Sequence, residues 1–191
     1  MTRAPVISVE RLTAFTKNDL ADLCDAADAA IEAGGGFGWV RPPPRHIFES
    51  YWKGALLVPE RQLFVGRLDG TIAASAQMAR PARNNEAQAF SATLMSSFVA
   101  PWARGHGLAK LVTLAAEDAA RTSGAHLINL DIRETQTAAI QLYETMGYTR
   151  WGVHPYYAKV DGKLVRGFFY YKFIDGGATE AALAEIAGVT T

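Results

Sequence analysis

Residues 103–112 read ARGHGLAKLV, in which Arg104, Gly105 and Gly107 stand directly before an apolar run at helical spacing. A glycine inside a helix destabilises it by about 1 kcal/mol relative to alanine. A helix N-terminus presents free backbone N–H groups and the positive end of the helix dipole. The stretch therefore predicts an anion site, where the bare backbone lets a pyrophosphate approach closely; tight packing is the alternative reason for such a glycine pair.

The residues after Gly107 exclude two common phosphate-binding loops. A Walker loop requires Gly-Lys-Ser/Thr, but Leu108 and Ala109 follow Gly107. A dinucleotide fingerprint requires a third glycine at the position that Lys110 occupies. An anion site at this helix therefore needs support from the rest of the chain.

The composition indicates one globular domain. The chain has 191 residues, of which 49% are hydrophobic and 20% are charged. The 19 basic and 19 acidic residues leave no net charge, so we do not expect nucleic acid as a partner. We expect one domain over residues 1–175 and a tail over residues 176–191 that forms a short helix or frays.

The location expected from the sequence is the cytoplasm. The N-terminal residues contain no apolar stretch of signal-peptide length, and no later segment approaches about 18 uninterrupted apolar residues, so we expect no membrane span. The single cysteine, Cys24, lies in an expected helix and is interpreted as a buried, inert thiol. The four histidines lack the spacing of metal ligands, so no metal site is expected.

Hydrophobic periodicity and turn signals divide the chain into strands and helices. Strands are expected over residues 7–13, 61–68, 71–79, 89–101, 126–132, 148–154 and 165–174, with an Asp-Gly turn between the second and third. Helices are expected over residues 16–36, 46–57, 104–121 and 136–146, the first opened by a capping box at Thr16 and Asp19. This order predicts an α/β (α+β) fold, a mixed sheet with helices on both faces.

Two separated stretches carry a family resemblance. VAPWARGHGLAKLV (99–112) and LDIRETQTAAIQLYETMGY (130–148) resemble the GNAT superfamily of acetyl-CoA-dependent N-acetyltransferases. The first matches the family motif at Arg104, Gly107 and Ala109. The second matches at Ala139, Leu142, Tyr143, Glu144 and Gly147, with Tyr148 for the usual phenylalanine and Gln136 for the usual asparagine. The resemblance implies a mostly antiparallel sheet of six to seven strands and acetyl-CoA as the acetyl donor.

A narrower resemblance concerns the acceptor. Residues 148–172, together with ASAQ at 74–77, resemble acetyltransferases of the tabtoxin-resistance type, which detoxify a small amino-acid-like toxin. It implies a small-molecule amine as the acceptor, reached by direct attack in a ternary complex. We further expect neither nucleic acid nor membrane as a partner, and a homodimer as one possible assembly.

The resemblance implies a set of donor-binding residues. In the family the end of the fourth strand pairs with pantetheine, and the helix N-terminus holds the pyrophosphate. His106 matches a variable motif position and is expected near the phosphates, not as a base. The expected donor-binding residues are Phe98, Val99, Arg104, Gly105, His106, Gly107, Leu108, Ala109, Lys110, Gln136, Ala139 and Tyr143.

Catalysis needs help for the leaving thiolate and a base for the amine. The resemblance implies that Tyr143 lies near the donor sulfur; a core aromatic is the alternative that the helix pattern leaves open. A phenol with a pKa near 10 favours a hydrogen bond to the developing thiolate over full proton transfer. Asp131 and Glu134 are candidate bases, although each could equally be a solvated edge charge or an ion-pair partner; His154 or an ordered water is the alternative base.

The proline-rich aromatic segment FGWVRPPPRHIFESYW (37–52) is the expected acceptor wall. Trp39, Tyr51 and Trp52 could stack on a substrate and Glu49 could attract a cationic amine, although aromatic residues in such a segment also form core. His154 and Tyr157 are further acceptor candidates. Two rival functions remain: a noncatalytic acyl-CoA sensor on the same fold, and an enzyme that acetylates protein N-termini or lysines.

Overall fold

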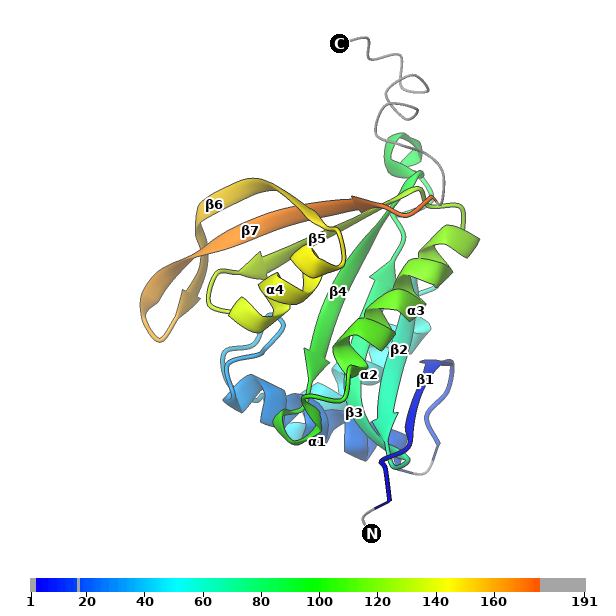
Figure 1. The fold of residues 1–191 in the computed structure, drawn as a ribbon, viewed down its shortest axis with the longest axis vertical. Helices are drawn as coiled ribbons and strands as arrows, with labels where there is room; N and C mark the ends of the chain where they lie inside the picture. The colour runs from blue at the N-terminus through cyan, green and yellow to red at the C-terminus, as the bar shows by residue number, and fades with distance from the viewer. Residues whose placement is uncertain (1–2, 17, 176–191) are drawn as a thin grey trace.

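The structure is a computed structural model that describes residues 3–16 and 18–175 (Figure 1). Its strands are β1 (Ile7–Leu12), β2 (Arg61–Leu68), β3 (Thr71–Ala79), β4 (Ser91–Val99), β5 (Leu127–Arg133), β6 (Thr149–Val160) and β7 (Lys163–Phe173). Its helices are α1 (Asp19–Glu32), α2 (Arg45–Leu57), α3 (Leu108–Thr122) and α4 (Thr137–Thr145), with short 3₁₀ turns at Glu86–Gln88 and Pro101–Ala103. None of the helices in this described part has the length and apolar character needed to span a bilayer.

The strands form one seven-stranded sheet in the order β1-β2-β3-β4-β5-β7-β6. Every neighbouring pair is antiparallel except β4 and β5, which run parallel. The β2–β3 hairpin closes at Asp69 and Gly70, which both have positive φ as a type I′ turn requires. The predicted mixed, mostly antiparallel sheet is confirmed.

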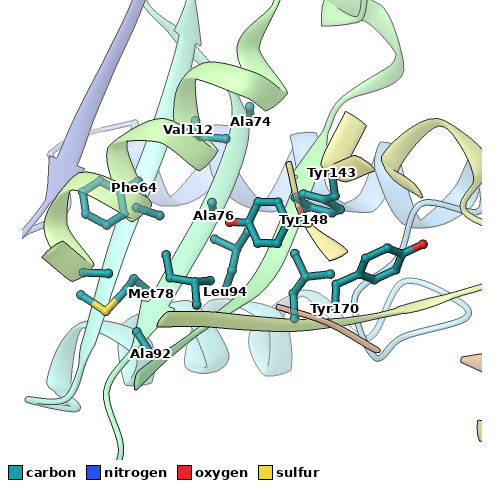
Figure 2. Packing of buried hydrophobic residues seen from close by; sticks show 14 of the residues in the cluster. Phe64, Ala74, Ala76, Met78, Ala92, Leu94, Val112, Tyr143, Tyr148 and Tyr170 are labelled. Carbon is teal, nitrogen blue, oxygen red and sulfur yellow. The ribbon is translucent and has the colours of Figure 1, made fainter. Parts of the chain in front are cut away.

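Helices cover both faces of the sheet (Figure 1), and the alternation of β2 decides which side chain meets which helix. Phe64 belongs to the core cluster beneath α3 and α4, whereas Leu63 and Val65 belong to the cluster beneath α1 and α2. Figure 2 shows the α3 side, where Val112 of α3 and Tyr143 of α4 lie among the side chains of the central strands.

The parallel pair β4–β5 separates beyond its first residues. Only Ser91–Thr93 pair with Leu127–Asn129, so within residues 3–16 and 18–175 the rest of β4 has no hydrogen-bonded strand on its β5 side. A bulge adds to the divergence: the β3–β4 register shifts between Ser75 and Gln77, and Ser96 has φ of 50°. The sheet is therefore open between the carboxyl ends of β4 and β5.

Several boundaries differ from the sequence expectation: the helix expected over residues 16–36 spans Asp19–Glu32, and the strand expected over residues 89–101 spans Ser91–Val99. The helix expected from residue 104 begins at Leu108, because Gly105 and Gly107 both have positive φ and cannot be part of a right-handed helix. Strand β6 continues to Val160 rather than ending at His154. Pro155 is tolerated because β6 is an edge strand whose pairing with β7 is interrupted between His154 and Ala158. The expected tail over residues 176–191 lies outside the described residues.

Candidate active site

A cavity of about 1100 Å³ occupies the opening between β4 and β5. It is lined by the loop 33–38, the carboxyl ends of β4 and β5, the start of α3, α4 and part of β6. Among its described lining residues, Arg104, Lys110, Arg133 and Lys159 are basic and Asp131 is the one carboxylate. The cavity thus carries four basic side chains and one carboxylate among its described lining residues.

The start of α3 forms one end of this cavity. Gly107 is the N-cap residue, with φ of 77°, and no side chain caps the helix. The first intrahelical bond runs from the Leu111 N–H to the Gly107 carbonyl, which leaves the preceding N–H groups available at the cavity. Gly105 also has positive φ, at 84°, so the need for two left-handed residues explains the glycine pair. The predicted anion site has the local geometry that it requires.

Most of the expected donor-binding residues lie together here. Only His106 among them is not part of the lining, and its side chain is exposed. The residues that do line the cavity are Phe98, Val99, Arg104, Gly105, Gly107, Leu108, Ala109, Lys110, Gln136, Ala139 and Tyr143.

Tyr143 is both a core residue and a cavity residue. Its side chain is 5% exposed, and its ring packs edge-to-face on Tyr148 with 5.3 Å between centroids (Figure 2). Burial raises the pKa of its phenol, although side-chain hydrogen bonds with Ser97 and Thr113 act in the opposite direction. The phenol therefore stays protonated at neutral pH and can donate a hydrogen bond within the cavity.

Asp131 and Tyr157 form a pair on the cavity wall. The Tyr157 hydroxyl donates a hydrogen bond to Asp131 Oδ2. Burial and this bond to a carboxylate both raise the pKa of the Tyr157 phenol. Asp131 itself is exposed, and both residues line the cavity. Asp131 is therefore a carboxylate at the cavity wall whose Oδ2 is bonded by Tyr157.

Glu134, the second expected base, has a different environment. Its carboxylate accepts hydrogen bonds from the Arg166 backbone N–H at 2.8 Å and from Arg166 Nε at 2.6 Å. These bonds lower the pKa of Glu134, which makes it a weaker base, and it is not part of the cavity lining. The catalytic role expected for Glu134 does not fit this placement.

The expected acceptor wall is only partly at the cavity. Tyr51 lines it, and its hydroxyl lies 2.7 Å from Ser96 Oγ and accepts a hydrogen bond from Gln77 Nε2 at 3.2 Å. Trp52 is fully buried, and Trp39 packs edge-to-face on Tyr51 with 4.9 Å between centroids. Neither tryptophan lines the cavity, so the substrate contacts expected for them are replaced by packing in the α1–α2 core cluster.

Glu49 and His154 also lie away from the cavity lining. Glu49 faces Arg45 and Lys53 in surface ion pairs along α2, at 3.5 and 3.4 Å. His154 is exposed, and its Nδ1 accepts a hydrogen bond from the Tyr156 backbone N–H. The acceptor contacts expected for these two residues do not fit their positions.

A feature that the sequence analysis missed is the anchored loop 33–38. The carbonyl oxygen of Gly36 accepts hydrogen bonds from Arg133 Nη2 and from Gln136 Nε2, the latter at 2.9 Å. A Cβ at Gly36 would lie 2.2 Å from the Trp39 carbonyl oxygen, so the tight loop requires glycine. The sequence does carry a signal for the anchor residue Arg133. The alternation Asp131-Ile132-Arg133 predicts that the two charged side chains share one face of β5.

No group of histidine, cysteine, aspartate and glutamate side chains suited to a metal ion occurs within residues 3–16 and 18–175.

Comparison with known proteins identifies the family. The family model for the acetyltransferase (GNAT) family matches residues 26–148. An uncharacterized N-acetyltransferase encoded in the hisH-hisA intergenic region of Azospirillum brasilense is 66% identical over 130 residues, which cover 68% of this chain and 77% of that protein. A mycothiol acetyltransferase from Thermobispora bispora is 41% identical over 61 residues, or 32% of this chain and 21% of that protein.

The fold agrees with the sequence matches. A Salmonella typhimurium protein described as an acetyltransferase, solved with its cofactor acetyl-CoA, superposes with a TM-score of 0.72 at 18% identity, over 91% of this chain and 96% of that one. The open sheet between β4 and β5, the glycine-led start of α3 and these matches lead to one conclusion. This chain belongs to the GNAT family and is an acetyltransferase.

Proposed function

We propose that the protein transfers an acetyl group from acetyl-CoA to the primary amine of a small molecule, by direct attack in a ternary complex. The observation that carries this proposal is the single cavity in which the open N-terminus of α3, Tyr143 and Asp131 meet. An anion site, a hydrogen-bond donor and a carboxylate are the groups that such a transfer requires.

The residues present fit acetyl-CoA. The uncapped start of α3, with Arg104 and Lys110 beside it, suits a pyrophosphate. Beyond Thr93 the β5 side of β4 has no strand partner in the described part of the chain, so the backbone at Phe98 and Val99 can pair with an extended pantetheine arm as an added strand would. The structural neighbour that was solved with acetyl-CoA supports the same donor.

The chemistry divides between the donor and this chain. Acetyl-CoA supplies a thioester, whose carbonyl carbon forms a bond to the amine nitrogen as the carbon–sulfur bond breaks. Asp131, the one carboxylate among the described lining residues, would accept the proton that the amine loses. Tyr143 would donate a hydrogen bond to the departing sulfur; its raised pKa makes full proton transfer to a thiolate still less favourable than for an ordinary phenol.

The acceptor side favours a small molecule. The loop 33–38 is fixed across the cavity by Arg133 and Gln136, which both bind Gly36. Tyr51 and Ser96 form a compact polar wall on the same cavity. A loop fixed by two hydrogen bonds to one carbonyl leaves less room for a protein surface than an open groove does.

The test is release of CoA thiol from acetyl-CoA in the presence of amino acids, simple amines, and peptides with free N-termini or lysines. We expect turnover with at least one class of small amine, with kcat/KM at least about tenfold above that for any peptide. A preference for peptides would instead support a protein acetyltransferase. Tight acetyl-CoA binding without turnover on any acceptor would support a sensor.

A further inference from the structure

Arg133 is a nearly buried cation without a counter-ion. Its side chain is 8% exposed, and it lines the cavity. Within residues 3–16 and 18–175 no carboxylate lies at ion-pair distance from it, whereas the little-exposed cations Arg67 and Lys172 pair with Asp19 and Glu117 at 2.8 Å. Burial lowers the pKa of the Arg133 guanidinium, the direction expected for a cation that lacks water or an anion. The cavity wall therefore carries a nearly buried positive charge that an anionic ligand could neutralise.

The orientation of this guanidinium is set by the anchored loop. One nitrogen, Nη2, donates to the Gly36 carbonyl. A guanidinium has five N–H donors in a rigid fork, and a carboxylate binds to such a fork through two parallel hydrogen bonds. With one donor fixed by Gly36 and the side chain at the cavity wall, the fork retains donors for a ligand.

Asp131 and Arg133 present opposite charges along one strand. They are two residues apart on β5, so both lie on the face opposite Leu130 and Ile132, which belong to the core cluster beneath α3. Two residues of strand span about 7 Å. Tyr157 donates its hydroxyl to Asp131 and does not neutralise either charge. This wall is complementary to a small zwitterion, with its ammonium at Asp131 and its anion at Arg133.

We propose that Arg133 determines acceptor specificity by binding a carboxylate adjacent to the reacting amine, so that the acceptor is a free amino acid or a close analogue. This proposal rests on the proposed acetyl transfer. The donor pyrophosphate has its proposed place at the N-terminus of α3 beside Lys110, whereas Arg133 stands on β5 and binds the Gly36 carbonyl. Arg104 also reaches this loop, with its Nη2 3.9 Å from the position of a Cβ at Gly35. Saturating acetyl-CoA in the test therefore keeps the donor phosphates in place while acceptors are compared.

The experiment uses matched acceptors with the full chain at saturating acetyl-CoA: an L-amino acid, its methyl ester, and the corresponding amine without the carboxyl group, for several side chains. For the preferred side chain, wild type should show a kcat/KM at least about tenfold higher for the acid than for the ester or the amine. Arg133→Met should lower kcat/KM for the acid at least about tenfold more than for the ester and the amine, which should lose only what the weakened loop anchor costs. Arg133→Lys should restore part of the loss.

Gln136→Leu is the matched control, because Gln136 binds the same Gly36 carbonyl without carrying a charge. It should lower the rates for acid, ester and amine by similar factors and leave the acid-to-ester ratio at its wild-type value. Equal losses for all three acceptors in Arg133→Met would overturn the proposal and reduce Arg133 to a loop anchor. A wild-type preference for the ester or the amine would also overturn it.

A failure of the proposed acetyl transfer can be recognised separately. If no acceptor is acetylated although acetyl-CoA binds, the transfer proposal fails, and Arg133 is judged by calorimetry on the complex with CoA. The carboxylate site would then be supported if wild type binds the amino acid at least tenfold more tightly than its ester, and if this difference in affinity disappears in Arg133→Met. Equal affinities, or no detectable binding of either compound, would refute it.

Discussion

At the scale of the residue, Tyr143 shows how burial and function combine in one side chain. Its ring packs in the core beneath α3 and α4, while its hydroxyl lies at the cavity beside Ser97 and Thr113. A buried phenol with a raised pKa keeps its proton, which suits a hydrogen-bond donor and not a base.

Replacing Tyr143 with phenylalanine keeps the ring and most of its packing but removes the donor. A hydrogen bond to a developing charge contributes about 1.5 to 3 kcal/mol, so we expect kcat to fall roughly 10- to 150-fold with little change in the KM for acetyl-CoA. Steady-state and single-turnover kinetics provide the measurement. Tyr148→Phe is the control, because Tyr148 is buried in the same cluster but does not line the cavity. A Tyr143→Phe variant that keeps more than half of wild-type kcat, with chemistry rate-limiting, would rule out this role.

At the scale of the element, the start of α3 is where backbone conformation serves ligand binding. Gly107 has φ of 77°, and a Cβ built there would meet no atom within 4 Å. A side chain at this position would therefore point into free space at the cavity rather than clash with the protein. Its cost to folding is the left-handed conformation, about 1 to 2 kcal/mol for an L-residue.

Gly107→Ala should raise the Kd for acetyl-CoA at least about tenfold, because the added methyl group lies on the path of the pyrophosphate. Isothermal titration calorimetry measures the effect. Gly162→Ala is a matched control: Gly162 lies in the β6–β7 turn with φ of 80°, also without an atom near its Cβ. Both variants should lose similar stability, but only Gly107→Ala should lose affinity. Unchanged binding would remove α3 from the donor site.

A buried ion pair joins α1 to the sheet. Asp19 accepts hydrogen bonds from the Thr16 N–H and hydroxyl and from Arg67 Nη2 of β2. Burial by itself would raise the pKa of Asp19, but the bonds from Thr16 and Arg67 outweigh burial and lower it. The pair therefore stabilises the fold while Asp19 is ionised.

Asp19→Ala should lower the free energy of unfolding by about 3 kcal/mol at pH 7, because it leaves Arg67 without its buried partner. Since the folded pKa of Asp19 is lowered, the stabilisation is fully present above the ordinary value of 3.8 and is lost as the pH falls below it. Urea denaturation from pH 7 to pH 3 should show the difference between wild type and variant shrinking. Glu10→Gln, which changes the exposed partner of Arg67, should cost less than about 1 kcal/mol. Equal losses in both variants would contradict this account.

At the scale of the whole molecule, the sheet consists of two parts, β1–β4 and β5–β7, which separate at the opening between β4 and β5. Among the described residues, strand pairing between the β1–β4 part and the β5–β7 part is limited to Ser91–Thr93 with Leu127–Asn129. A ligand that fills the cavity contacts both parts, so its binding should stabilise the entire fold.

Acetyl-CoA at about 100 times its Kd should add about 2.7 kcal/mol to stability, which corresponds to a rise in Tm of roughly 5 to 11 °C for a chain of this size. Differential scanning calorimetry measures the shift. Gly107→Ala at the same donor concentration should show a rise smaller by about 1.4 kcal/mol, the equivalent of tenfold weaker binding. An unchanged Tm under conditions where titration reports saturation would show that the ligand does not favour the folded state.

The sequence by itself determined the features that depend on neighbouring residues along the chain. The Asp69-Gly70 turn, the alternation of the strands and the glycine-led start of α3 follow from local backbone preferences, and the two motifs pointed to the family. Only the tertiary structure decided which side chains meet at the cavity. Trp52, which we expected in the acceptor wall, lies in the core instead, because burial of a large aromatic side chain against α1 stabilises the fold. Arg133 lines the cavity because the carboxyl end of β5 is separated from β4 beyond Asn129. The sequence does not show this separation, because it depends on contacts between strands that are distant along the chain.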